Sequence, residues 1–190
     1  MQIFTDFQVV EPTEKQLQAF ENPEGYVPIF LRSAEGQDWY ESFDLFSDDT
    51  VKLMFNSDGV IVSIVDAPVP ERGDIYAVSM FFPDGLSVAE IEGMLPEGFE
   101  LDSRTWVYRD GTVEQDQTLL DAYNLAINQE QYRSRVNELT NEMLMLQAAI
   151  TTGRATEKQQ ARFTALQNYA VDLSEVDLTQ AKPDWPDNPL

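Results

Sequence analysis

The residue types that could support catalysis are few in this chain. Its 190 residues include no histidine and no cysteine. Histidine is the commonest general base and metal ligand near neutral pH, and cysteine supplies thiolate nucleophiles, disulfides and thiolate metal sites. An enzyme built from this sequence would have to work with carboxylates, lysine, tyrosine, serine or threonine. The composition therefore favours a protein that is not an enzyme and that uses no metal or other cofactor.

Carboxylates are the most abundant of the remaining reactive groups. The run Ser47-Asp48-Asp49-Thr50 offers oxygen ligands, but it lacks the alternating acids, the glycine and the terminal glutamate of a calcium-binding loop. It is typical of turn and capping chemistry. A carboxylate-based hydrolase would need two acids about 5–10 Å apart in a cleft, and no motif indicates such a pair. The sequence also lacks the glycine-rich patterns that bind nucleotide phosphates.

The net charge is strongly negative. The chain has 34 acidic and 12 basic residues, a formal net charge of −22. Residues 1–115 contribute −17 and residues 116–190 contribute −5. This charge disfavours nucleic acid and anionic membranes as direct ligands. It fits a solvated surface or an acidic face that meets a basic partner. An acidic decoy that mimics nucleic acid and blocks a DNA-binding protein is the alternative hypothesis.

Residues 1–115 have the pattern of a β-rich domain. Two alternating apolar runs, 51–56 and 60–65, flank Asp58-Gly59 and predict a hairpin. A shorter hairpin is predicted around Asp110-Gly111. The other elements expected in this region are strands at 26–32 and 76–82, a short capped helix at 87–94 and a helical turn at 14–20.

From about residue 117 the pattern becomes helical. Residues 118–152 contain no proline and no glycine, so one helix of about 50 Å is predicted at about 1.5 Å per residue. Gly153 is suited to end this helix, and Thr156 with Gln159 forms a capping box for a second helix over about 157–175. Because the connection is short, we expect the two helices to pack antiparallel.

Apolar residues recur at intervals of three and four along both helices, which predicts a seam. The seam residues are Tyr132, Val136, Leu139, Met143, Leu146, Ile150, Phe163, Leu166 and Leu173. We interpret the seam as hairpin packing, and a homodimer through the same helical arm is the alternative. The second helix is too short to cover Leu119, Leu120, Tyr123 and Ile127 of the first, so these residues need another partner. The proline-rich tail cannot be helical, and we expect Trp185 to pack onto the hairpin.

The fold class predicted from these patterns is α+β. A β-rich N-terminal domain, residues 1–115, precedes a long helix and a C-terminal antiparallel helical hairpin with an ordered Pro/Trp tail, residues 116–190. The first ten residues have no basic start, and no run of eighteen apolar residues occurs, so neither a secretion signal nor a membrane span is expected.

The end of the chain resembles that of bacteriophage tail-fibre assembly proteins. The resemblance lies in Gly153-Arg154-Ala155-Thr156-Glu157 at the helical turn, in Val176-Asp177, and in the tail Lys182-Pro183-Asp184-Trp185-Pro186. Two positions differ from the pattern, since Leu166 stands where many members have Trp and Glu175 where Arg is expected. Similar N-terminal segments are Asp38-Trp39-Tyr40-Glu41, Asp49-Thr50-Val51-Lys52, Asp58-Gly59-Val60-Ile61, Gly85-Leu86-Ser87-Val88-Ala89-Glu90 and Trp106-Val107-Tyr108.

This resemblance implies an assembly chaperone of a phage or prophage. Such a protein would bind the C-terminal tip region of the trimeric tail-fibre protein and promote its folding and trimerisation. It would act in the host bacterial cytoplasm during assembly and could stay bound at the tail-fibre tip of the virion. Strand edges and apolar surface of an unassembled β-rich tip are aggregation hazards that a binder can shield.

The aromatic pair near the N-terminus is the predicted contact with the fibre. Trp and Tyr are enriched at interface hot spots, so we assign Trp39, Tyr40 and Glu41 to the fibre-binding surface. The alternative is that the two aromatic residues belong to the core. Met80, Phe81 and Phe82 are predicted core residues on a strand.

Overall fold

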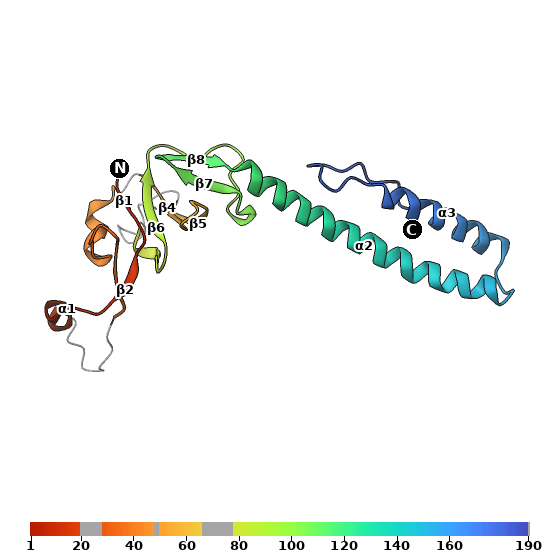
Figure 1. Cartoon of the computed structure of the whole chain (residues 1–190), viewed down its shortest axis with the longest axis horizontal. Coiled ribbons are helices and arrows are strands. Elements are labelled where there is room, and N and C mark those ends of the chain that lie inside the picture. Colours follow the sequence, from red (N-terminus) through yellow and green to blue (C-terminus); the bar gives the residue numbers. More distant parts are fainter. Residues whose placement is uncertain (20–27, 48–49, 66–77, 190) are drawn as a thin grey trace, which may run out of the picture. The chain divides into compact units, whose positions relative to one another are not determined.

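The computed structural model describes residues 1–19, 28–47, 50–65 and 78–189 (Figure 1). The chain has α+β architecture, as predicted. It divides into two compact units, Met1–Gln117 and Thr118–Leu190. The first unit holds the strands, and the second holds most of the long helix, the second helix and the tail.

A four-stranded antiparallel sheet forms the centre of the first unit, with the strand order β1-β6-β4-β5. Its strands are β1 (Ile3–Phe4), β4 (Val51–Phe55), β5 (Ile61–Val65) and β6 (Ser87–Ile91). Two ribbons of two antiparallel strands accompany it, and they consist of β2 (Gln8–Val10) with β3 (Phe30–Arg32) and of β7 (Trp106–Arg109) with β8 (Thr112–Gln115).

Both faces of the central sheet are covered by apolar side chains. Neighbouring residues of β6 point to opposite faces, so that Val88 lies in one core and Ala89 in the other. The first core consists of Phe4, Phe7, Leu31, Trp39, Phe46, Val78, Phe81 and Val88. The second core consists of Val51, Leu53, Phe55, Ile61, Ala89, Ile91, Trp106 and Tyr108. All five residues of β6 are buried as a result.

Both predicted hairpins are confirmed. Strands β4 and β5 pair antiparallel around Gly59, with a register shift between Met54 and Phe55, and β7 pairs with β8 around Gly111. The helical turn predicted at 14–20 is the helix α1 (Glu14–Ala19), and residue 20 lies outside the described residues. The strand predicted at 26–32 is present only in part, as β3 over Phe30–Arg32. Residues 28–29 are not in a strand, and residues 26–27 lie outside the described part of the chain.

The helix predicted at 87–94 is wrong, because Ser87–Ile91 is the strand β6. This strand pairs with β1 on one side and with β4 on the other. The Ser87 hydroxyl, expected to cap a helix, accepts a hydrogen bond from the Asp6 N–H at 3.0 Å. Pairing with two strands thus overrides a local capping signal.

The strand predicted at 76–82 is also wrong in its described part. Val78–Met80 form a 3₁₀ helix, η4, while residues 76–77 lie outside the described residues. Phe81 is buried in the first core as predicted, but Met80 and Phe82 are exposed. The 3₁₀ turn directs Val78 and Phe81 inward together, since residues three apart share a face of such a helix.

The helical unit follows the predicted hairpin. Helix α2 (Gln117–Thr151) and helix α3 (Glu157–Ser174) lie side by side and antiparallel (Figure 1). Gly153, with a φ of 68°, ends α2, where its N–H bonds the Ile150 carbonyl at 3.0 Å and the Arg154 N–H bonds the Ala149 carbonyl at 2.9 Å. Thr156 and Gln159 form both bonds of the predicted capping box.

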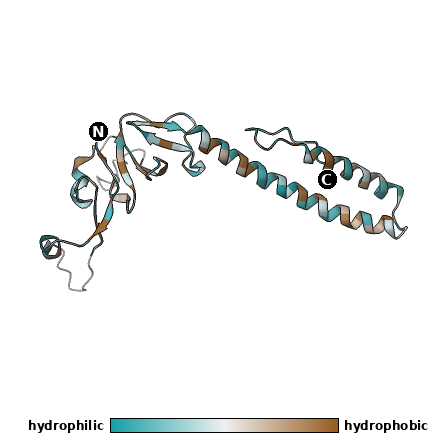
Figure 2. Ribbon diagram, in the orientation of Figure 1, coloured by the Kyte–Doolittle hydropathy of each residue, from teal (hydrophilic) through white to brown (hydrophobic). Residues whose placement is uncertain are grey.

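One apolar cluster joins the two helices. It is built on Leu139, Leu146, Leu166, Tyr169 and Leu173, which are all buried. Of the other seam residues, Tyr132, Val136, Met143 and Phe163 pack against this cluster, and Ile150 is half-buried. Hydrophilic and apolar residues alternate along α2 in Figure 2.

The tail doubles back along α2 after α3 ends (Figure 1). Asn128 Nδ2 donates to the carbonyls of Leu178 at 3.0 Å and Gln180 at 2.9 Å. Farther along α2, the Arg135 guanidinium lies 4.7 Å from the centre of the Trp185 ring, which packs on the helical cluster as predicted.

The end of the tail is held by a third polar group. Arg162 donates to the Pro189 carbonyl and to both carboxylate oxygens of Glu142, at 2.7 and 3.1 Å. Asn128, Arg135 and Glu142 are spaced by seven residues, which places them on one side of α2. We name these three residues the polar ladder.

The turn at Gly59 generates a prediction about stability. Its φ is +83°, and an added Cβ would lie 2.8 Å from the Tyr108 carbonyl oxygen, whereas Gly111 has a φ of +85° and open space around it. Gly111→Ala should lower the free energy of unfolding by about 1–2 kcal/mol, the cost of the left-handed conformation. Gly59→Ala should lower it by at least about 1 kcal/mol more, because β7 must also move. Urea unfolding measures both, and equal losses would contradict the close approach of the hairpins.

Asn128 generates a second prediction. Asn128→Ala leaves two carbonyls of the tail without their donor, so the free energy of unfolding should fall by about 1–3 kcal/mol. Asn137→Ala, on an exposed position of the same helix, makes the same change in helix propensity and is the control. Thermal unfolding followed by circular dichroism compares them. If the two variants were equally stable, the tail would not depend on Asn128.

Candidate functional site

A short 3₁₀ helix, η1 (Tyr40–Leu45), follows β3 in the first unit. The Asp38 carboxylate fixes its start. Oδ1 accepts hydrogen bonds from the backbone N–H groups of Tyr40 at 2.9 Å and Glu41 at 3.2 Å, while Oδ2 accepts one from the Gln16 side chain of α1 at 2.7 Å. Because Asp38 is itself buried, η1 has a defined position on the first core.

The predicted contact residues separate into core and surface. Trp39 is only 2% exposed, and its ring meets those of Phe7 and Phe43 edge to face at 5.1 Å each. The assignment of Trp39 to the fibre-binding surface is therefore wrong, and the alternative, a core position, is correct. Its position at the turn into η1 points the indole inward. A substitution at Trp39 would change the stability of the first core and would not report on fibre binding.

Tyr40 and Glu41 lie at the surface. Tyr40 is 37% exposed, and its ring packs edge to face on Phe30 and Phe43 at 5.7 and 5.9 Å. Its hydroxyl donates to the Ile29 carbonyl at 2.9 Å. The ring is thus held rigidly while one side faces solvent. An aromatic side chain of this kind loses little conformational entropy when a partner covers it.

Other exposed apolar side chains belong to η1 itself or to segments that contact it. Ile29 is its hydrogen-bond partner, Leu45 is on η1, and Met80 and Phe82 belong to η4 and its end, which packs against η1. We define these five residues, which are 37–65% exposed, as the η1 surface. Sequence patterns did not identify this group, because the 3₁₀ geometry that exposes Met80 and Phe82 has no periodicity long enough to recognise.

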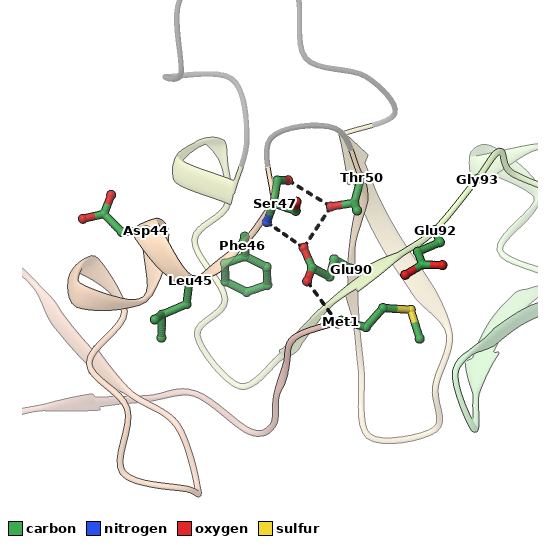
Figure 3. Close-up of a pocket in the computed structure, with 9 residues that line it drawn as sticks. All are labelled: Met1, Asp44, Leu45, Phe46, Ser47, Thr50, Glu90, Glu92 and Gly93. Carbon is green, nitrogen blue, oxygen red and sulfur yellow. Dashed lines mark hydrogen bonds and ion pairs between the residues drawn. The ribbon is translucent and has the colours of Figure 1, made fainter.

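A pocket of about 670 Å³ adjoins the end of η1 (Figure 3). It is lined by Met1, Asp44, Leu45, Phe46, Ser47, Thr50, Glu90, Glu92 and Gly93. Glu90 is buried, whereas Asp44 and Glu92 are exposed carboxylates. The lining therefore combines negative charge with the apolar side chains of Met1 and Leu45, which suits a basic or amide side chain of another protein.

Hydrogen bonds hold the Glu90 carboxylate in place. It accepts from the N–H groups of Gln2 and Ser47, both at 2.8 Å, and from the Thr50 hydroxyl at 2.9 Å, and it lies 3.7 Å from the Met1 ammonium (Figure 3). Its neighbour across the strands, Lys52, is also buried and donates to the carbonyls of Ser47 and Thr50. Glu90 and Lys52 thus tie the chain start and the segment before β4 to the sheet.

The pKa of Glu90 follows from these contacts. Burial alone would raise it, but the hydrogen bonds from Ser47, Thr50 and Gln2 outweigh burial and lower the pKa below its ordinary value. A carboxyl group that acts as a general acid needs a raised pKa near the working pH. Glu90 is therefore suited to holding structure and not to proton transfer.

The described residues give no support to a metal centre. Among them, no three His, Cys, Asp or Glu side chains gather as a metal ion requires. In the acidic run at 47–50, Asp48 and Asp49 lie outside the described part of the chain. The Thr50 hydroxyl shares its hydrogen between Glu90 and the Ser47 carbonyl at 3.0 Å, and the contact with Ser47 is turn chemistry. None of the described helices is long and apolar enough to cross a membrane.

Comparison with known proteins identifies a family. A family model described as "Caudovirales tail fibre assembly protein, lambda gpK" matches residues 42–190. The match begins within η1, so Trp39, Tyr40 and Glu41 precede it. It includes Leu45, Met80 and Phe82 of the η1 surface, the pocket lining apart from Met1, and the whole helical unit.

Individual relatives align over a longer part of the chain. "Tail fiber assembly protein U" of Escherichia phage Mu is 31% identical over 182 residues, which cover 93% of this chain and 92% of the relative. "Probable tail fiber assembly protein" of Escherichia phage P2 is 30% identical with the same coverage. "Tail fiber assembly protein U'" of phage Mu is 22% identical over 161 residues, 84% of each chain.

Glu90 generates a prediction about acid stability. Because its folded pKa is lowered, its contribution to stability is complete above the unfolded pKa of about 4.3–4.5 and is lost as the pH falls through the folded value. Glu90→Gln should lower the free energy of unfolding at pH 7 by about 1.5–3 kcal/mol. The difference from the unmodified protein should shrink below about pH 5.

The control is Glu92→Gln, which changes an exposed carboxylate of the same pocket. It should follow the unmodified protein at every pH in urea unfolding. A Glu90→Gln deficit that stays constant from neutral to acid pH would show that the carboxylate charge does not carry the effect.

Proposed function

The chain belongs to the family of Caudovirales tail fibre assembly proteins, and from that premise we propose that it is a chaperone for a tail-fibre protein. In this proposal it binds the C-terminal tip region of the fibre protein and promotes folding and trimerisation of that region. The observation that carries the proposal is the family match over residues 42–190, together with relatives that align over 93% of the chain.

The η1 surface is the proposed contact with the fibre. An unassembled β-rich tip exposes strand edges and apolar side chains that would otherwise aggregate. Exposed apolar residues on a fixed 3₁₀ helix can cover such surface without a large loss of conformational entropy. Tyr40 fits this role best, because its ring is already immobilised by Phe30 and Phe43.

Charge gives the complex its solubility and part of its selectivity. The net charge of −22 keeps the chaperone and a bound fibre segment apart from other copies. Close to the η1 surface, Glu41, Asp44 and Glu92 are exposed, so a fibre segment with basic side chains is favoured. Fibre folding takes place in the host bacterial cytoplasm. If the chaperone dissociates slowly from the fibre, it stays bound at the tail-fibre tip.

The proposal contains no catalytic step and no cofactor. Binding alone is sufficient to shift a folding equilibrium. A chaperone that binds the folded fibre tip, and not the unfolded tip, stabilises the folded tip by mass action. Family membership favours this explanation of the acidic surface over the decoy that mimics nucleic acid.

Substitutions on the η1 surface test the proposal. Met80→Glu with Phe82→Glu should weaken binding to the C-terminal fragment of the cognate fibre protein at least tenfold, about 1.4 kcal/mol, because two carboxylates would have to be desolvated. Both side chains are exposed, so the fold should be retained. Isothermal titration calorimetry at fixed salt measures the affinity.

The matched control is Val171→Glu, which places a charge at an exposed apolar position of α3 in the other unit. It should bind the fragment with unchanged affinity. Undiminished binding by a folded Met80→Glu/Phe82→Glu variant would exclude the η1 surface as the contact. Failure of the unmodified protein to bind the fragment would contradict the proposed function itself.

A further inference from the structure

Strand β2 (Gln8–Val10) is the outer strand of the ribbon that it forms with β3. The two strands pair antiparallel, and Val9 stands opposite Leu31. In an antiparallel ladder, the backbone N–H and C=O of one residue point to the same side of the strand, and those of the next residue point to the other side. Every second residue of β2 therefore directs its backbone groups away from β3.

Hydrogen bonds on the far side of β3 identify this residue of β2 as Val9. The Leu31 carbonyl accepts from the Trp39 N–H at 3.0 Å, and the Ser33 N–H donates to the Gln37 carbonyl at 2.9 Å. Leu31 thus points its backbone groups away from β2, so Leu31 and Val9 are a pair that exchanges no hydrogen bonds. The backbone N–H and C=O of Val9 therefore point to the outer edge of β2.

Phe7, two residues before Val9, uses the same edge. Its N–H donates to the Leu86 carbonyl at 2.9 Å, and its carbonyl accepts from the Gly85 N–H at 2.7 Å. These partners belong to a β-turn that the Leu86 N–H and the Pro83 carbonyl close at 2.9 Å. Because the partner segment turns back at this point, it does not continue alongside Val9. Pairing along the outer edge therefore stops after Phe7.

The outer edge of β2 is open at Val9. This residue is 54% exposed, and among the described residues none bonds its outward N–H or carbonyl. Charged residues and proline commonly protect an edge strand against further pairing, and Gln8–Val10 contain neither. The edge is short, but it can accept one more extended segment.

Neighbouring residues connect this edge to the η1 surface. Phe82 directly precedes the turn of residues 83–86 that bonds Phe7, and Ile29 directly precedes β3. Both Phe82 and Ile29 are exposed members of the η1 surface. A segment that pairs with Val9 can therefore also place apolar side chains on that surface.

We propose that the outer edge of β2 docks an extended segment of the tail-fibre protein, which pairs with Val9 as an additional strand. The inference rests on the proposed function and specifies how the fibre is bound. An outward N–H and C=O on one residue are complementary to the backbone of a β-strand, whatever its side chains. An unassembled β-rich tip offers such strand edges, and pairing with β2 would protect one of them from aggregation.

Val9→Pro in the full chain tests the proposal. Proline has no N–H, and its ring would stand at the edge where the docked segment lies. Binding to the C-terminal fragment of the cognate fibre protein should weaken by about fivefold or more, measured by isothermal titration calorimetry. The bonds between β2 and β3 should remain, because the Val9 N–H takes no part in them. Circular dichroism checks that the fold is kept.

The matched control is Val9→Thr, which keeps the N–H and the β-branched shape and should bind the fragment with unchanged affinity. Amide hydrogen exchange of the unmodified protein, followed by NMR, is a second measurement that needs no substitution. Exchange of the Val9 amide should slow by about tenfold or more when the fragment binds. The amide of Glu97, an exposed residue of the same unit, is the reference and should keep its rate.

Three results would overturn docking at this edge while leaving the proposed function in place. They are full affinity in a folded Val9→Pro variant, an equal loss of affinity in Val9→Thr, and a Val9 amide that exchanges as fast in the complex as in the free protein. An equal loss in Val9→Thr would assign the effect to the side chain and not to backbone pairing. Failure of the unmodified chain to bind the fragment would instead contradict the proposed function, and docking at β2 with it.

Discussion

The pairing of a 35-residue helix with an 18-residue helix is the constraint on which the helical unit depends. An α-helix that is not covered by its partner leaves apolar and polar seam positions open to solvent. Here the tail returns along α2 and covers part of what α3 cannot reach. Asn128, only 4% exposed, would be a buried unsatisfied amide without the carbonyls of Leu178 and Gln180. The tail is therefore an integral layer of this unit.

The polar ladder gives the tail a defined register. Each of its three members makes a different contact. Asn128 donates to two carbonyls of the tail, and Arg135 lies over the Trp185 ring. Glu142 binds Arg162, which also donates to the Pro189 carbonyl. Apolar packing alone would tolerate sliding of an extended segment, whereas directional contacts at intervals of seven residues do not. The arrangement fixes the Pro/Trp tail that the resemblance to the family first indicated.

In the first unit, the sheet is fixed from both sides. Its inner strand β6 is buried throughout, and Glu90 at its end collects hydrogen bonds from two other segments. The close approach of Gly59 to Tyr108 joins the sheet to the β7–β8 ribbon. This scaffold holds η1 through Trp39 and Asp38, so the η1 surface is presented by a rigid support. A surface that is fixed before binding suits a chaperone that must recognise an incomplete fold.

Local signals in the sequence predicted the elements whose structure is decided locally. The Asp-Gly turns, the Thr156 capping box and the glycine end of α2 were all predicted correctly, because each depends on residues close in sequence. The strand β6 was predicted as a helix because its neighbours β1 and β4 are distant in sequence. The burial of Trp39 depends on the path of η1, which the local sequence does not specify. The polar ladder left a usable signal, a repeat of seven flanking the apolar seam.

We propose that this chain promotes folding and trimerisation of a tail-fibre tip. Co-expression with the C-terminal fragment of the cognate fibre protein, followed by light scattering on a sizing column, tests it most directly. The fragment should be a soluble trimer when this chain is present and insoluble or unassembled when it is absent. A fragment that trimerises equally well alone, and never elutes with this chain, would contradict a role for this chain in tip assembly.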